Sequence, residues 1–347
     1  MTAPRPAHRS SGASRVAGVA SALFGGGSAT VFALLIVIFA GIFAMNPSFM
    51  EPPSLMAFIK NAAPLVVLAI GQYFVIVAGE LDLSVGSLVG TQVVIAAALI
   101  DGEESRTGPV LLLMLVFGVL VGLVNGLITT VLKVHSLITT LGMMLVLYGA
   151  NRLWTGGAPT GALSEAFRQP GRGGVEMPVV RLLPWSLLIL VAVVIAAVVV
   201  MRRPYGRVLI AVGDNEQAAA FSGVRVWQVR TAAFVLSSVM ATLAAVLIGG
   251  YAGVTAQVGE GLEFAAITAV VLGGVVLGGG RGTVIAAMAG ALTVEALFTL
   301  FNQLSLPSTI RPAAQGLIII AAVAYAARER SQPAPPVDDA RPEPARS

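Results

Sequence analysis

Long stretches without a charged residue are the feature that most constrains how this chain folds. A helix needs about 20 mostly apolar residues to cross a bilayer, and one central Arg, Lys or Asp costs about 2.5–3.5 kcal/mol on insertion. Six stretches contain no Asp, Glu, Lys or Arg at all: 16–50, 61–79, 83–100, 107–132, 182–201 and 231–259. Their repetition along the chain predicts many membrane-spanning helices.

The expected fold is therefore an all-α, polytopic membrane protein with about ten transmembrane helices. Charged residues make up 11% of the chain, whereas a soluble domain has about a quarter. Residues 1–27 are predicted as an N-terminal tail, 28–327 as the transmembrane domain and 328–347 as a disordered C-terminal tail. The expected spans are 28–45, 54–78, 83–101, 109–132, 136–154, 183–201, 227–250, 262–279, 283–301 and 310–327.

An even number of spans places both termini on one side of the membrane. With the termini inside, 14 of the 21 basic residues lie in cytoplasmic segments and seven lie outside or at outer span ends. Cytoplasmic loops are enriched in Lys and Arg, so both termini are predicted to be cytoplasmic. The sequence pI of about 9.8 then follows from topology and does not require a nucleic-acid surface.

Composition also excludes several kinds of catalytic site. The chain has no cysteine, and His8 and His135 are its two histidines, so neither a Cys-ligated nor a His-cluster metal site is expected. The glycines of 278–282 resemble a phosphate loop only superficially, because no G-x-x-x-x-G-K-[ST] pattern occurs. We expect a protein that is not an enzyme and that holds no cofactor of its own.

A short polar helix is predicted over 214–223, between two long apolar spans. Asp214 is a good N-cap, Gln217 stands three residues later as in a capping box, and Gly223 is a natural stop. About eight residues give roughly 12 Å of helix, which is too short to cross a bilayer. Such a helix on the cytoplasmic side suits docking into a groove on a partner.

Residues 79–87 interrupt the apolar run between the second and third expected spans. Glu80, Asp82, Ser84 and Ser87 place two carboxylates and two hydroxyls within eight residues. One interpretation is a turn in which the acid caps the next helix. The other is an irregular segment lining a polar cavity, since non-helical backbone at membrane depth persists only where protein or water covers it.

Isolated polar residues inside the expected spans are further candidates. Glu295 is a lone acid, with no other charged residue between 282 and 310. Intramembrane acids usually face a cavity or a partner, although Glu295 near the outer end could also snorkel. Uncharged polar groups suit hydroxyl-rich ligands, but they can equally form helix–helix hydrogen bonds. These groups are Gln72, Asn125, Thr139, Thr140 and Asn302.

Several motifs follow one another along the chain. They are Gly79-Glu80-Leu81-Asp82-Leu83-Ser84-Val85-Gly86-Ser87, Gly122-Leu123-Val124-Asn125-Gly126, Thr140-Leu141-Gly142-Met143, the 205–223 stretch, and Val270-Val271-Leu272-Gly273-Gly274 continued by Gly279-Gly280-Arg281-Gly282. In this order they resemble the permease subunit of ribose-type ABC sugar importers, and the similarity covers roughly residues 30–325.

This resemblance implies a multi-pass protein of the bacterial cytoplasmic membrane that works as a homodimer. A cytoplasmic ABC ATPase, which holds ATP and Mg²⁺, would drive it, and an extracytoplasmic binding protein would deliver a monosaccharide or similar polyol. The short cytoplasmic helix would dock on the ATPase. The expected coupling residues are Asp214, Asn215, Glu216, Ala218, Ala219 and Gly223, and the expected pathway residues are Gln72, Asp82, Ser84, Asn125, Thr140 and Glu295.

The sequence departs from that family pattern at three places. Glu80 stands where a glycine is common, His135 and Ser136 stand where prolines are common, and Glu295 replaces a small or apolar residue. One alternative is the related branched-chain amino-acid permease. Another is an ion-coupled secondary carrier, which would leave the 214–223 helix unexplained. A membrane-embedded enzyme is disfavoured because no acid–base pair converges.

Overall fold

The computed structural model describes residues 27–178, 180–255 and 257–330. Most of this part of the chain is helical, and the bounds of the elements follow in chain order. They are α2 (Gly27–Met45), η1 (Pro47–Met50), α3 (Pro52–Val77), α4 (Val85–Ile100), α5 (Glu104–Thr130), α6 (Ser136–Thr155), α7 (Glu165–Arg172), β1 (Gly174–Met177), β2 (Arg181–Pro184), α8 (Trp185–Arg202), α9 (Pro204–Asp214), α10 (Glu216–Phe221), α11 (Val226–Ala252), α12 (Leu262–Leu272), α13 (Val284–Gln303) and α14 (Ile310–Arg330).

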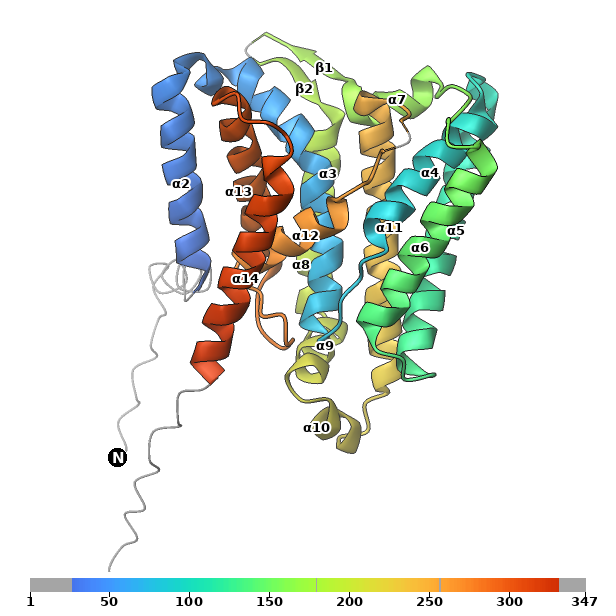
Figure 1. Ribbon diagram of the computed structural model, residues 1–347, viewed down its shortest axis with the longest axis vertical. Coiled ribbons are helices and arrows are strands. Elements are labelled where there is room, and N and C mark those ends of the chain that lie inside the picture. Colours follow the sequence, from blue (N-terminus) through green and yellow to red (C-terminus); the bar gives the residue numbers. More distant parts are fainter. Residues whose placement is uncertain (1–26, 179, 256, 331–347) are drawn as a thin grey trace, which may run out of the picture.

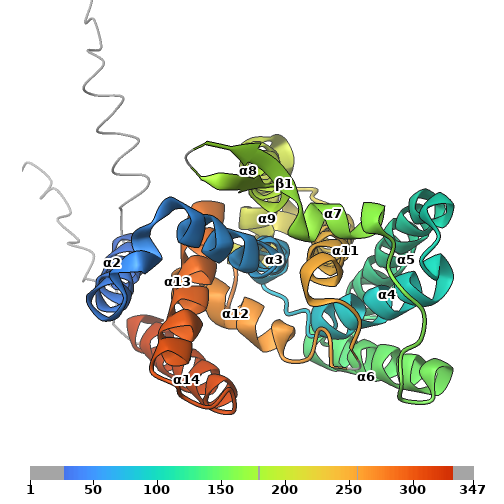
Figure 2. The same cartoon turned by 90° about the horizontal axis from the view of Figure 1, so that it is seen from above.

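Two long helices, α3 and α11, form the centre of the molecule (Figures 1 and 2). In each of them 61% of the most apolar 18-residue window is buried, compared with 22% in α8. Helix α11 contacts α3 on one side and α5 on the other. The outer helices expose large apolar side chains, such as Leu112 of α5 and Ile138 of α6, as expected for a surface that faces lipid.

Five of the described helices are long and apolar enough to cross a membrane: α3, α5, α8, α11 and α13. The structure thus supports a helical, polytopic membrane protein, and the predicted total of about ten spans stays a prediction. In Figure 1 the start of α2 and the end of α14 lie at the same end of the molecule as α9 and α10. We call this the α10 end, and the end that carries α7 and the β-hairpin the α7 end.

One expected span is a helix over only part of its length. Residues 262–279 were expected to be helical, but α12 ends at Leu272 after 11 residues, or about 16 Å. Gly274 and Gly279 have φ of +84°, a backbone conformation that ends a helix. The chain then runs as a loop to Thr283, where α13 is capped. A helix of this length cannot cross a bilayer alone.

The connection between the expected spans 136–154 and 183–201 contains regular structure. Helix α7 is capped by Ser164, whose Oγ accepts from the Phe167 backbone N–H at 3.2 Å, and Phe167 is fully buried. Strands β1 and β2 pair antiparallel as a hairpin, with Val175 opposite Leu183. The all-α prediction therefore holds for the spans and misses this small hairpin.

The predicted tails lie mostly outside the described residues. The N-terminal tail was expected to end at residue 27, where α2 begins. The C-terminal tail was expected from residue 328, but α14 continues to Arg330, so residues 328–330 are helical.

Close packing of α5 on α11 generates a stability prediction. A Cβ on Gly126 would lie 2.7 Å from the Thr231 Cα, whereas a Cβ on Gly41 of α2 meets none of the described atoms within 4 Å. We expect Gly126→Ala to lower the free energy of unfolding by about 1–3 kcal/mol through overpacking. Gly41→Ala, the control, should be neutral or slightly stabilising because alanine favours helix. Thermal unfolding of both variants in detergent checks this, and equal midpoints would contradict it.

Candidate functional site

The chain is not helical between α3 and α4, and this break organises the polar residues of the core. Helix α3 ends at Val77, Gly79 has φ of +84°, and α4 begins at Val85. The backbone groups of residues 79–84 lack the bonds that a continuous helix would supply. In a membrane interior such groups need other partners, because each unsatisfied one costs several kcal/mol.

Asp82 lies at the centre of the break and is fully buried. Its Oδ1 accepts hydrogen bonds from the Ser84 N–H at 3.0 Å and the Ser84 hydroxyl at 2.6 Å. Its Oδ2 accepts from the Ser237 hydroxyl of α11 at 3.1 Å. The side-chain amide of Gln72, in the orientation that matches donors with acceptors, pairs with both the N–H and the carbonyl of Asp82 at 3.2 Å.

Helices α5 and α6 complete the network around this segment. Thr140 Oγ1 accepts from the Leu83 N–H at 3.1 Å, and Ser136 Oγ accepts from the Leu81 N–H at 3.2 Å. Asn125 Nδ2 donates to Ser84 Oγ at 2.9 Å. The non-helical segment is thereby tied to four helices, α3, α5, α6 and α11.

The structure thus brings together five of the six residues predicted to line the pathway. Gln72, Asp82, Ser84, Asn125 and Thr140 are all fully buried and form one hydrogen-bonded network. Asp82 accepts from the N–H of Ser84, the residue before α4, and so closes a turn there, but no described side chain caps the first turn of α4. That these side chains line a transport pathway stays a prediction.

Glu295, the sixth predicted pathway residue, lies apart from the network. It stands on α13, and it interacts electrostatically with Arg311 of α14 and Tyr251 of α11. Arg311 also donates to Asn302 Oδ1 at 3.0 Å and lies 5.0 Å from the Phe298 ring centroid. Glu295 therefore belongs to a separate polar group between α13 and α14.

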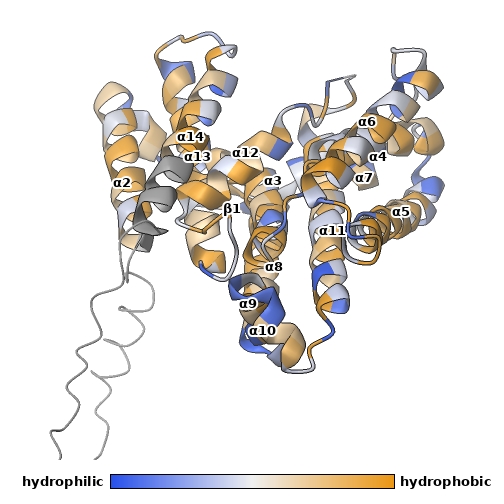
Figure 3. Cartoon of the chain, turned by 60° about the horizontal axis from the view of Figure 1, so that its bottom comes forward, coloured by the Kyte–Doolittle hydropathy of each residue, from blue (hydrophilic) through white to orange (hydrophobic). Residues whose placement is uncertain are grey.

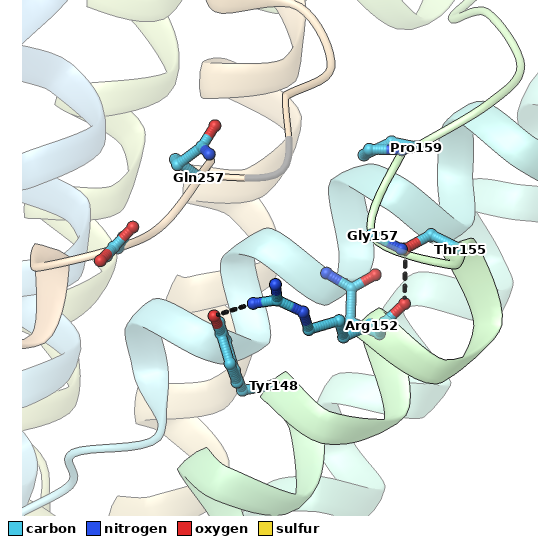
Figure 4. Close-up of a pocket in the computed structure, with 8 residues that line it drawn as sticks. Tyr148, Arg152, Thr155, Gly157, Pro159 and Gln257 are labelled. Atoms are coloured by element: carbon cyan, nitrogen blue, oxygen red, sulfur yellow. Dashed lines mark hydrogen bonds between the residues drawn. The ribbon is translucent and has the colours of Figure 1, made fainter.

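A cleft of about 270 Å³, lined by both polar and apolar residues, lies beside the network, between α4, α6 and the segment before α12. We call it the α4–α6 cleft. A smaller cavity of about 130 Å³ continues it past Arg152, Thr155 and Gln257. In Figure 4 Arg152 hydrogen-bonds to Tyr148 on α6, with Gln257 on the segment across from them. The polar residues of the α4–α6 cleft are Ser87, Thr91, Tyr148, Asn151, Glu260 and Glu263.

This cleft is not among the sites predicted from the sequence, although one signal was present. The uncharged stretch 231–259 ends at Glu260, and Glu263 follows one helical turn later at the start of α12. Glu263 is only 7% exposed. Its carboxylate packs against Gly86 of α4, where an added Cβ would overlap it. Recognising the cleft needed the close approach of two segments more than 150 residues apart.

The short helix at the opposite end begins later than predicted. Asp214 is the last residue of α9, and the Asn215 N–H donates to the Ala211 carbonyl at 3.0 Å as part of that helix. Asn215 is the N-cap of α10, because its Oδ1 accepts from the Ala218 N–H at 2.9 Å. The proposed capping by Asp214 and Gln217 is therefore wrong.

The C-terminal limit of α10 is as predicted, since Gly223 directly follows the cap residue and has φ of +82°. Phe221 is 91% exposed and Ala219 is buried, so α10 presents one face outward. Figure 3 shows hydrophilic residues gathered on α9 and the start of α10. The predicted coupling residues thus lie on or beside an exposed helix at one end of the molecule.

Residues 54–323 match the family described as branched-chain amino acid transport system / permease component. The chain belongs to this permease family. The permease is 33% identical over 297 residues to the ribose import permease protein RbsC of Bacillus subtilis (strain 168), covering 83% of this chain and 88% of that protein. It is 32% identical to the autoinducer 2 import system permease protein LsrC of Enterobacter sp. (strain 638), covering 87% of each chain.

The ribose import permease protein RbsC of Haemophilus influenzae is 31% identical, and the match covers 84% of this chain and 90% of that protein. No solved structure matches the permease significantly. These relatives confirm the resemblance to ribose-type importer permeases that the motifs indicated. The permease is a multi-pass membrane protein and a transport subunit.

The polar network generates a prediction with a matched neighbour as control. Thr140→Val removes the acceptor for the Leu83 N–H, and we expect a loss of about 1–3 kcal/mol because a buried donor is left unpaired. Thr139 Oγ1 is also buried, but it has no hydrogen-bond partner among the described residues, so Thr139→Val should cost little. Denaturation midpoints of the two variants in detergent measure the difference, and a reversed order would refute the assignment.

Proposed function

We propose that this permease imports a monosaccharide or similar polyol as the membrane subunit of an ABC importer. The observation that carries this proposal is the α4–α6 cleft, whose hydroxyl, amide and carboxylate groups suit a ligand with many hydroxyls. Support also comes from the named relatives, which are import permeases for ribose and for autoinducer 2. ATP and Mg²⁺ belong in this scheme to a separate ATPase subunit.

The orientation follows from the basic residues and from the positions of the two sites. The predicted cytoplasmic segments include α9 and α10, so the α10 end faces the cytoplasm and receives the ATPase. Helix α6 runs away from that end to Thr155, which places the cleft toward the α7 end (Figure 1). An extracytoplasmic binding protein would therefore deliver the ligand at the α7 end, and both termini would be cytoplasmic.

A second copy of the chain completes the proposed assembly. Helices α6 and α14 expose apolar side chains, among them Ile138 at 65%, Leu317 at 69% and Ile320 at 67%. Two copies joined through these helices would enclose a pathway between them, as in a closed C₂ dimer. Membrane lipid would cover the remaining outer faces.

The branched-chain amino-acid alternative is favoured only by the description of the family. A ligand of that class needs an apolar pocket for its side chain. The α4–α6 cleft offers apolar side chains in Met144, Leu145 and Val258. It also places Glu260, Asn151 and Thr91 around the space, and these groups suit a ligand with several hydroxyls. An ion-coupled secondary carrier is not supported, because the relatives belong to import systems with separate permease subunits.

ATP hydrolysis in proteoliposomes tests the proposed function. The permease is reconstituted with its candidate ATPase, with and without a loaded binding protein. We expect stimulation by the loaded binding protein and its loss in Glu216→Arg, because a reversed charge on exposed α10 opposes docking. Glu176→Arg, on β1 at the α7 end, should leave ATPase association unchanged. Absence of association with an authentic cognate ATPase would refute the proposal.

The role of the cleft has a separate test in substrate uptake. Asn151→Leu removes an amide from the cleft while keeping its volume, and we expect KM for uptake to rise about tenfold, the effect of one lost hydrogen bond of about 1.4 kcal/mol. Leu153→Ala, on the same helix and 87% exposed, is the control. If KM is unchanged in Asn151→Leu while ATPase stimulation is intact, the α4–α6 cleft is not part of the substrate pathway.

A further inference from the structure

Arg230 of α11 contacts two separate parts of the permease at the α10 end, helix α10 and the connection from α3 to α4. Its Nη1 lies 3.1 Å from Glu80 Oε1 in the α3–α4 break and 2.9 Å from Glu216 Oε2 on α10. Its Nε donates to the Ala78 carbonyl, just after α3, at 3.3 Å. One guanidinium thus joins α10 to the break that contains Asp82.

The two ion pairs differ in their exposure. The side chains of Arg230 and Glu80 are 15% and 12% exposed, whereas that of Glu216 is 54% exposed. A buried pair is strongly destabilised when one partner is removed, because a charge is left uncompensated. An exposed pair is weak and breaks easily. The inner contact with Glu80 is therefore the durable one, and the outer contact with Glu216 is the one that can be made and broken.

The break continues directly into the wall of the α4–α6 cleft. Glu80 is two residues before Asp82, and the Asp82 network holds Ser84, from which α4 begins. The first turns of α4 supply Gly86, Ser87 and Gly90 to the cleft. The route from Glu216 to Ser87 runs through Arg230, Glu80, Asp82 and Ser84. Neighbouring residues on it are joined by an ion pair, a hydrogen bond or the chain itself.

A backbone junction holds the same region in place without Arg230. The Gly280 N–H donates to the Val77 carbonyl at 2.9 Å. A Cβ on Gly213, near the end of α9, would overlap that carbonyl, so the three segments meet in backbone contact. This junction fixes α9 and the end of α3, whereas Arg230 is the side chain that links them to α10.

We propose that Arg230 is a positioning residue that transmits the position of α10 to the α4 wall of the cleft. The proposal rests on the proposed function in one respect, that α10 is the element a cytoplasmic partner moves. The competing explanation is that Arg230 merely neutralises buried Glu80, in which case its contact with Glu216 has no consequence at the cleft.

The test uses the permease alone, without ATPase, binding protein or substrate. The chain has no cysteine, so Ser87→Cys creates a single reactive thiol at the cleft. The rate of its modification by a small methanethiosulfonate reagent is measured with the protein in lipid nanodiscs. We expect Glu216→Gln and Arg230→Gln each to change this rate at least threefold, because both release α4 from α10. Arg230→Lys, which keeps the charge, should restore the rate toward that of the parent.

Gln217→Ala, on the same exposed helix, is the matched control and should leave the rate unchanged. If Arg230→Gln changes the rate and Glu216→Gln does not, Arg230 only neutralises Glu80 and the proposal is overturned. If neither changes it, the proposal is overturned as well. If Arg230→Gln does not fold, the result with Glu216→Gln alone tests the proposal. Glu216→Gln is expected to fold because the Glu216 side chain is 54% exposed. ATPase docking plays no part in this assay. A negative result here therefore overturns the role of Arg230 without bearing on the proposed function.

Discussion

The structure depends on one constraint: backbone that leaves a helix within a membrane needs side chains to satisfy it. The chain leaves the helix between Ala78 and Ser84, and residues on four surrounding helices supply the partners. Asp82 alone binds Ser84 and Ser237, and Gln72 pairs with its backbone. Because these bonds fix α3, α5, α6 and α11 around one segment, the break sets how the central helices are arranged.

A second non-helical segment follows α12, and it packs against the end of α3, where the first non-helical segment begins. The loop between Leu272 and Thr283 brings Gly280 against the Val77 carbonyl, and glycine is required there because φ is +74° and the Asp214 backbone is close. Both non-helical segments therefore meet at the end of α3. Helix α9, which leads directly into α10, packs against this place through Gly213 and Asp214.

Charged residues are few, and those closest to the core lie in two different parts of the molecule. Arg230 and Glu80 lie nearly buried at the α10 end, whereas Glu260 and Glu263 line the cleft toward the α7 end. Removing charges from water is costly, so each buried carboxylate needs a cation, hydrogen bonds or a ligand to offset that cost. The Arg230 guanidinium offsets it for Glu80, backbone N–H groups that include the one of Gly261 offset it for Glu263, and Glu260 is exposed.

The sequence by itself determined the membrane class and the family, because uncharged stretches and ordered motifs are properties of neighbouring residues. It also located the residues of the polar network, but not their association: Leu83 and Thr140 are 57 positions apart, and only packing brings them together. Asp214 and Asn215 are equally good caps in isolation, and the hydrogen bonds of α9 decided between them. The cleft, the end of α12 and the Arg230 contacts depend on distant segments meeting, so only the tertiary structure decided them.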